Sequence, residues 1–227
     1  MLTHIPVITI DGPSGTGKGT ISQLLARKLG WHYLDSGAIY RVLALAALRE
    51  NVPLNGEEAL MHLAVDLPLH FSDQQENFRL LLNEEDVTEK IRTEACSQAA
   101  SMVSAFPKVR DALLKRQRDF QQLPGLVTDG RDMGTVIFPW ADVKIFLDAS
   151  VEERAQRRYK QLQNFGIHDS IAAILAELKA RDQRDRTRAV APLKPAENAV
   201  LIDTSHLTIS EVMNQICTIL PKEFFGG

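Results

Sequence analysis

The sequence predicts an α/β protein built on a doubly wound, five-stranded parallel sheet. Five short apolar segments have the pattern of buried strands, and each is followed by an aspartate. Helical patterns separate most of them, and strands that alternate with helices form parallel sheets with helices on both faces. A glycine-rich loop between the first strand and the first helix marks one edge of this sheet. The expected strands are 7–10, 31–34, 126–128, 143–147 and 200–202.

Composition and charge exclude several classes of protein. The 227 residues are enough for one α/β domain with insertions, or for two small domains. A formal charge of −3 gives no global attraction to nucleic acid or anionic membranes. Cys96 and Cys217 form no C-x-x-C pair, which argues against a metal site or a disulfide framework. The N-terminus shows no signal-peptide pattern, and the apolar run 42–48 is too short to cross a bilayer. We therefore expect a cytoplasmic protein that binds neither nucleic acid nor membrane, and we expect a monomer.

The glycine-rich loop runs from Gly12 to Thr20 and reads Gly-Pro-Ser-Gly-Thr-Gly-Lys-Gly-Thr. Its glycines remove Cβ atoms where the backbone must turn with positive φ and bring its N–H groups against phosphate oxygens. The N-terminus of a helix over 18–29 faces the same anion, and Lys18 can add a point charge at the β and γ phosphates. The loop therefore predicts ATP binding by Gly12, Pro13, Ser14, Gly15, Thr16, Gly17, Lys18, Gly19 and Thr20.

The segments beyond this helix predict the remaining elements in order. Gly30 fits a helix C-cap, and Ser36 fits the N-cap of a helix over 38–49. After Pro53 the pattern changes to one helix and two strands joined by a polar turn, which indicates a hairpin inserted into the βα chain. A capping box at Thr208 starts the last helix. The other expected ranges are helix 56–66, strands 67–72 and 78–83, helices 93–104 and 107–121, and helix 208–220.

An aspartate at the end of the third expected strand has the pattern of a carboxylate that orients magnesium. Asp129 ends that strand, and the following loop carries Arg131 and Asp132 at the same edge of the sheet, where open α/β sheets place ligands. We expect Mg²⁺ to have no direct protein ligand, with Thr20 and Asp129 able to contact it through water.

The strongest charge feature lies between the fourth and fifth strands. Interleaved acidic residues make most of these cations solvated partners of surface ion pairs. Arg181, Asp185 and Arg188 differ, because their i, i+4, i+7 spacing places them on one helix face. Asn164 to Gly166 could form the tip of a mobile flap that carries arginines over the phosphate loop. The cations are Arg154, Arg157, Arg158, Lys160, Lys179, Arg181, Arg184, Arg186 and Arg188.

Five segments of the sequence resemble bacterial cytidylate kinases, and the resemblance covers nearly the whole chain. The intervening Gly19 between Lys18 and Thr20 is similar to nucleoside monophosphate kinases and less like GTPases or motor ATPases. The resemblance implies a P-loop kinase core, an inserted monophosphate-binding domain and a short helical lid. The resembling segments are 11–20, 34–41, 105–110, 129–135 and 181–188. The implied regions are 1–40, 105–153 and 189–227 for the core, 41–104 for the inserted domain, and 154–188 for the lid.

The same resemblance implies roles for individual residues. Lys18, Arg131 and Arg157 would act on the transferring phosphoryl group, with Arg157 reaching the ATP phosphates when the lid closes. The residues implied for the acceptor fall into three groups. They are Arg41 and Arg131 for its phosphate, Ser101, Arg181 and Asp185 for its sugar, and Ser36, Arg110, Asp132 and Arg188 for cytosine.

The chemistry of cytosine supports the last group independently. Cytosine offers an N4 amino donor and acceptors at N3 and O2, which a carboxylate, guanidinium groups and a hydroxyl complement. We expect direct in-line transfer of the ATP γ-phosphoryl group to CMP, and to dCMP, without a covalent intermediate, because the acceptor phosphate is already anionic. The alternatives are a P-loop kinase with another acceptor such as uridylate, adenylate or shikimate, a GTPase, and a regulatory module without turnover. No N-K-x-D motif follows the fourth strand, which disfavours the GTPase.

Overall fold

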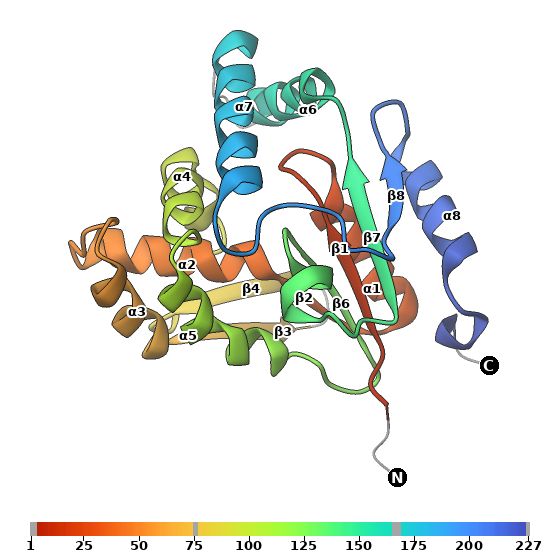
Figure 1. The fold of residues 1–227 in the computed structure, drawn as a ribbon, viewed down its shortest axis with the longest axis horizontal. Helices are drawn as coiled ribbons and strands as arrows, with labels where there is room; N and C mark the ends of the chain where they lie inside the picture. The colour runs from red at the N-terminus through yellow and green to blue at the C-terminus, as the bar shows by residue number, and fades with distance from the viewer. Residues whose placement is uncertain (1–3, 75–76, 165–168, 226–227) are drawn as a thin grey trace. The chain divides into compact units, whose positions relative to one another are not determined.

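A computed structural model describes residues 4–74, 77–164 and 169–225 (Figure 1). The chain divides into two compact units. The first unit comprises Met1–Leu34 and Arg118–Gly227, and the second comprises Asp35–Gln117. The three-region division expected from the sequence stays a prediction.

A five-stranded parallel sheet forms the centre of the first unit, which confirms the predicted fold class. Its strand order is β2-β6-β1-β7-β8, so β1 lies in the middle. In the register of β1 with β6, Ile10 lies opposite Asp129 and Asp11 lies opposite Gly130. The carboxyl ends of these two strands therefore meet at one edge, where the phosphate loop and the Arg131 loop both begin. The strands are β1 (Val7–Asp11), β2 (His32–Asp35), β6 (Leu126–Gly130), β7 (Val143–Asp148) and β8 (Val200–Asp203).

Two helices cover one face of this sheet, α1 (Lys18–Leu29) and α8 (Ile209–Ile219) (Figure 1). Their apolar residues join those of β1, β6, β7 and β8 in one core because each helix presents an apolar stripe. The predicted ends are confirmed: Gly30 closes α1 in the left-handed conformation, and Thr208 forms a capping box with Glu211. The buried members of this core are Ile8, Ile10, Ile21, Leu25, Ala26, Val127, Ile145, Leu147, Ile202, Val212, Ile216 and Leu220.

Two further helices of the first unit pack against each other, α6 (Val151–Asn164) and α7 (Ile171–Thr187). Their shared core is small and contains Ala155 and Leu162 from α6 with Ile174 and Leu178 from α7. The expected flap tip at 165–166 lies outside the described residues. A short π-helix, η2 (Met133–Ile137), follows β6 and was not predicted, and a 3₁₀ turn, η3 (Lys222–Phe225), follows α8.

The second unit combines helices with the predicted inserted hairpin. Strand β3 (Leu69–Gln74) pairs antiparallel with β4 (Asn77–Leu82), and the two-residue strand β5 (Glu85–Asp86), which the sequence pattern did not predict, extends them. Part of the polar turn between β3 and β4 lies outside the described residues. The helices are α2 (Ser36–Arg49), α3 (Glu57–Val65), the 3₁₀ turn η1 (Lys90–Arg92), α4 (Glu94–Val103) and α5 (Pro107–Arg118).

Two details of these helices differ from the sequence prediction. Ser36 is not the N-cap of α2: Asp35 is, and its Oδ1 accepts a hydrogen bond of 2.9 Å from the Ala38 amide. Aspartate is as good a cap as serine, and the side chain of Ser36 has a buried partner elsewhere. Helix α5 begins at Pro107 as expected but ends at Arg118, three residues earlier than predicted. Across the described residues, no helix combines the length and apolar character needed to span a bilayer.

Candidate active site

The phosphate loop joins β1 to α1 in a conformation that only glycine accommodates at two close approaches. A Cβ built on Gly12, whose φ is 151°, would lie 2.1 Å from the Leu147 carbonyl oxygen. A Cβ on Gly15, whose φ is 84°, would lie 3.0 Å from the Cβ of Arg154. The prediction of positive φ is wrong for Gly19, which lies inside α1 where an added Cβ meets nothing closer than 3.9 Å.

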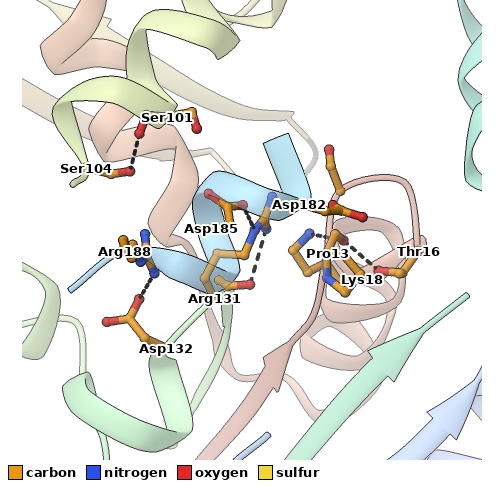
Figure 2. A network of polar contacts seen from close by, with 12 residues as sticks. Pro13, Thr16, Lys18, Ser101, Ser104, Arg131, Asp132, Asp182, Asp185 and Arg188 are labelled. Atoms are coloured by element: carbon orange, nitrogen blue, oxygen red, sulfur yellow. Dashed lines mark hydrogen bonds and ion pairs between the residues drawn. The ribbon is translucent and has the colours of Figure 1, made fainter. Parts of the chain in front are cut away.

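Polar contacts inside the loop converge on one carbonyl group. Lys18 Nζ donates to the Pro13 carbonyl over 3.0 Å, and Thr16 Oγ1 donates to the same oxygen over 3.1 Å (Figure 2). The first turn of α1 contains no acidic residue, so the positive end of its dipole is available to an anion. The loop, its lysine and the helix start thus combine the features that bind a polyphosphate.

Asp129 lies buried at the carboxyl end of β6, next to the start of this loop in the sheet. Its Oδ1 accepts a hydrogen bond of 2.6 Å from the Tyr33 hydroxyl, which holds the carboxylate in one orientation. Within the described residues, no three His, Cys, Asp or Glu side chains gather as a metal cluster. Magnesium in nucleotide sites commonly uses one or two carboxylates together with water and substrate phosphates, so the donors of Asp129 and Thr20 fit this ion.

A buried ion pair joins the loop after β6 to helix α7. Arg131 Nε donates to Asp185 Oδ2 over 2.9 Å, and Arg131 also donates to its neighbour's carbonyl at Gly130 (Figure 2). Burial acts to raise the pKa of Asp185, but the charges of Arg131, Arg181 and Arg188 outweigh it and hold that pKa below its usual value. Burial likewise acts against the charge of Arg131, yet Asp185 leaves the pKa of the guanidinium raised. Both groups are therefore charged at neutral pH.

A second ion pair lies beside the first. Arg188, the C-cap of α7, approaches Asp132 Oδ1 to 3.6 Å, and both side chains are buried (Figure 2). The predicted shared face of Arg181, Asp185 and Arg188 is consistent with this placement, because Arg181 and Arg188 both act electrostatically on Asp185. Two buried acid–base pairs thus connect the loop 131–132 with the end of α7.

Arg154 of α6 and Thr204, which follows β8, contact the phosphate loop, and Asp182 of α7 pairs with Arg154; the sequence pattern did not predict these as site residues. Arg154 is 3% exposed and donates to the Ser14 carbonyl over 3.1 Å while forming a two-pronged ion pair with Asp182. Thr204 Oγ1 donates to the Thr16 carbonyl over 3.2 Å. The only sequence signal was the membership of Arg154 and Asp182 in the charged stretch, where surface and buried charges look the same.

Arg157, expected at the ATP phosphates, belongs to α6, and its guanidinium lies against the loop that follows β8. Its guanidinium donates to Thr204 Oγ1 over 3.1 Å and to the carbonyl groups of Thr204 and Ser205. Since Thr204 itself contacts the phosphate loop, Arg157 is one residue removed from that loop in this structure.

The second unit holds the other predicted acceptor residues. Ser36 Oγ donates to Gln117 Oε1 over 2.7 Å, and both side chains are buried. Arg41 Nη1 approaches Asp35 Oδ2 to 3.4 Å. The Arg41 side chain is 26% exposed, so its guanidinium is partly open to solvent.

Arg110 and Ser101 lie on α5 and α4 of this unit. The Arg110 side chain is 5% exposed, packs over the Tyr40 ring at 5.7 Å and donates to the Ser104 carbonyl over 3.2 Å. Ser101 is buried, and its carbonyl accepts a hydrogen bond of 3.1 Å from Ser104 Oγ (Figure 2). A buried arginine whose guanidinium lies over an aromatic ring has its planar donor group held in one orientation.

Comparison with known proteins identifies the family of the chain. Residues 8–222 match the family model described as cytidylate kinase. The cytidylate kinase of Aeromonas salmonicida (strain A449) is 62% identical over 208 residues, covering 92% of this chain and 90% of the relative. That of Shewanella piezotolerans is 56% identical over 226 residues, covering 99% and 98%. A solved shikimate kinase from Bacteroides thetaiotaomicron has a TM-score of 0.45 at 13% identity, covering 95% of this chain and 98% of that one.

The family model spans the phosphate loop, the Arg131 loop and both buried ion pairs, and the two relatives agree with it over at least nine tenths of the chain. By this match the chain belongs to the cytidylate kinase family.

Proposed function

We propose that the chain transfers the γ-phosphoryl group of ATP to CMP and produces CDP and ADP. Family membership over residues 8–222 is the observation that carries this proposal. The proposal extends to dCMP, because the residues that the family resemblance assigns to the base and the phosphate do not depend on the 2′-hydroxyl. The partners in this proposal are the free nucleotides CMP and ATP. The monomeric state and the cytoplasmic location stay predictions.

The donor side of the proposal uses the phosphate loop. Backbone N–H groups from Gly12 to Thr20 and the start of α1 would bind the β and γ phosphates. Lys18 now donates to the Pro13 carbonyl, and a side-chain rotation would exchange this neutral acceptor for an anionic phosphate oxygen. Arg157 would reach the same phosphates when α6 and α7 close, by exchanging its contacts with Thr204 and Ser205.

The acceptor side uses the two ion pairs of the first unit and the arginines of the second. Arg131 would donate to the CMP phosphate while Asp185 keeps the guanidinium oriented. Asp185, Arg181 and, from the second unit, Ser101 would contact the sugar. Asp132 would accept from the cytosine N4 amino group, with Arg188 beside the carboxylate at 3.6 Å. Arg41 would bind the phosphate, and Arg110 and Ser36 would donate to the base acceptors.

The transfer needs alignment and charge neutralisation more than proton chemistry. The CMP phosphate is an anionic nucleophile, so no strong general base is required, and positioning of the two phosphates supplies much of the rate acceleration. Lys18, Arg131 and Arg157 would neutralise the charge that spreads over the transferring oxygens. Asp129 and Thr20 would hold Mg²⁺ through water, and the ion would supply positive charge that neutralises part of the phosphate charge.

A panel of nucleoside monophosphates tests this function directly. The chain should convert CMP and dCMP with ATP and Mg²⁺ at kcat values of about 1–100 per second, the usual range for kinases. UMP, AMP and shikimate serve as alternative acceptors in the same coupled assay. Faster turnover of one of these than of CMP would assign a different acceptor, and ATP binding without turnover of any would indicate a regulatory module.

A further inference from the structure

A buried carboxylate connects the start of the phosphate loop with the start of the Arg131 loop. Asp11 is the last residue of β1, directly before Gly12, and it is 4% exposed. Its Oδ1 accepts a hydrogen bond of 2.9 Å from the Met133 amide, and its Oδ2 accepts one of 2.8 Å from the Gly134 amide. Both oxygens of one side chain therefore bind backbone N–H groups more than 120 residues further along the chain.

The position of these amides makes the contact relevant to the acceptor side. The sheet register places Asp11 opposite Gly130, the last residue of β6. Arg131 and Asp132 are therefore held at both ends, by the β1–β6 ladder before them and by the Asp11 carboxylate after them. Met133 and Gly134 open η2, where the first amides of a helix have no acceptor within the helix. Asp11 supplies that acceptor from another strand.

The ionisation of Asp11 is set by opposing effects. Burial raises the pKa of Asp11 to about 6, while the hydrogen bonds from Gly134 and Met133 lower it. Asp132 adds a repulsive charge and Arg131 an attractive one. At pH 7 the carboxylate is therefore mostly ionised, although its environment is buried. An ionised acceptor binds both amides more strongly than an amide side chain in the same place.

We propose that Asp11 is a positioning residue that orients Arg131 and Asp132 toward the acceptor nucleotide. This inference rests on the proposed function. Asp11 does not touch the reacting atoms, because its two oxygens are engaged by the Met133 and Gly134 amides. Asp11 acts through the backbone of the Arg131 loop. Because Arg131 and Asp132 carry the proposed contacts with the acceptor nucleotide, binding of the acceptor depends on Asp11 more than binding of ATP does.

The test compares Asp11→Asn with a matched control in the parent chain. The asparagine oxygen can accept from one amide, but its NH₂ group meets the other amide donor to donor, so the loop loses its orientation. We expect the KM for CMP to rise about tenfold or more, while the KM for ATP changes less than twofold. The preference for CMP over UMP should shrink in parallel, because Asp132 would lose its orientation.

The control is Asp142→Asn. Asp142 Oδ2 accepts a hydrogen bond of 2.8 Å from the Val7 amide, so the same substitution removes a carboxylate–amide contact at the opposite end of β1. It should leave both KM values and the CMP preference unchanged. An Asp11→Asn variant with an unchanged KM for CMP, or with equal rises in both KM values, would overturn the positioning role.

Amide exchange in the parent chain provides a measurement that does not depend on folding of the variant. Met133 and Gly134 amides should exchange slowly in the free chain and more slowly with saturating CMP. Exchange of both at the rate of an unprotected peptide would overturn the proposal. The parent's own turnover separates the two failures: if the parent does not phosphorylate CMP, the proposed function fails, whereas an active parent with a kinetically silent Asp11→Asn refutes this inference alone.

Discussion

At the scale of single residues, the predicted site of the first unit contains buried charges that satisfy one another. Arg131 with Asp185 and Asp132 with Arg188 form two ion pairs, each joining the loop after β6 to the end of α7. Removing one partner of such a pair leaves the other charge buried and uncompensated, which costs more than the pair itself contributes. Substitutions here must therefore be judged against a stability measurement as well as an activity measurement.

Asp132→Ala should reduce the discrimination between CMP and UMP. Uracil carries an acceptor oxygen, O4, where cytosine carries the N4 amino group. UMP would therefore place this oxygen against the acceptor oxygen of the Asp132 carboxylate. A buried unpaired group costs about 1–3 kcal/mol, so the ratio of kcat/KM values should fall by about 5- to 150-fold. Arg110→Met should act in the same direction. Arg41→Ala is the matched control, since a phosphate contact should affect both substrates alike.

The outcome that contradicts this assignment is an equal loss for both acceptors in Asp132→Ala. The carboxylate would then orient the loop or Arg188, and another group would have to distinguish the bases. Thermal unfolding of each variant shows whether the loss of an ion-pair partner, rather than a change in recognition, explains a fall in activity.

Lys18→Ala should lower kcat by about 10² to 10³, which is the usual cost of losing one preorganised electrostatic donor. The fold should persist, because the contact that Lys18 makes with the Pro13 carbonyl is duplicated by Thr16. Lys28→Ala is the control: it removes the same side chain from an exposed position in the last turn of α1. Near-normal kcat in folded Lys18→Ala would remove the lysine from the mechanism.

At the scale of elements, the first turns of α6 and the last turns of α7 are anchored, whereas their opposite ends are not held by these contacts. Arg154 lies near the start of α6 and binds both Asp182, near the end of α7, and the Ser14 carbonyl. The core between the two helices is small. A pair of helices fixed at one end by a buried ion pair can pivot there, which is the geometry that lid closure requires.

Amide exchange should show this closure. With ATP and CMP together, exchange should slow in the second half of α6 and the first half of α7, whereas the anchored ends near Arg154 and Asp182 should change little. Helix α8 is the internal control, because its apolar residues pack on the sheet and not between α6 and α7. Unchanged protection in α6 and α7 under saturating nucleotides would show that they form a static pair.

At the scale of the whole molecule, stability and function impose opposing demands on the sheet edge. The chain carries a formal charge of −3, and two of its arginines, Arg131 and Arg188, are paired with the buried carboxylates of Asp185 and Asp132 where the loop after β6 meets α7. Burial of charge is unfavourable for folding, but under the proposed function the same groups would already be oriented for an anionic transition state. Asp11 is the clearest case because its pKa is raised in the folded chain.

The pH dependence of unfolding should reveal this cost. The pKa of Asp11 rises from 3.8 to about 6 on folding, so the folded chain binds this proton more tightly than the unfolded chain. Raising the pH from about 3 to about 7 should therefore remove about 3 kcal/mol of stability through this group, most of it between about pH 4 and about pH 6. Denaturant unfolding of the parent and Asp11→Asn isolates the effect: the variant should gain relative stability across that window. A difference that stays constant from pH 4 to 7 would contradict the raised pKa.

Local patterns in the sequence were sufficient for much of the fold. The five strands, the phosphate loop, the Gly30 and Thr208 helix boundaries and the inserted hairpin all depend on neighbouring residues, and all were predicted. Family resemblance supplied the residue roles at the site, and these stay predictions.

The tertiary structure decided the features that depend on residues far apart in the chain. Asp35 rather than Ser36 caps α2, and Ser36 Oγ instead donates a hydrogen bond to Gln117 Oε1, 81 residues away in the sequence. Asp11 looked like an ordinary strand-end aspartate until folding placed it on amides 122 and 123 residues further on. Arg154 looked like one surface cation among many, and only packing showed it to be buried. Sequence spacing reports contacts along one helix or strand, whereas burial and long-range hydrogen bonds arise only when segments distant in sequence pack together.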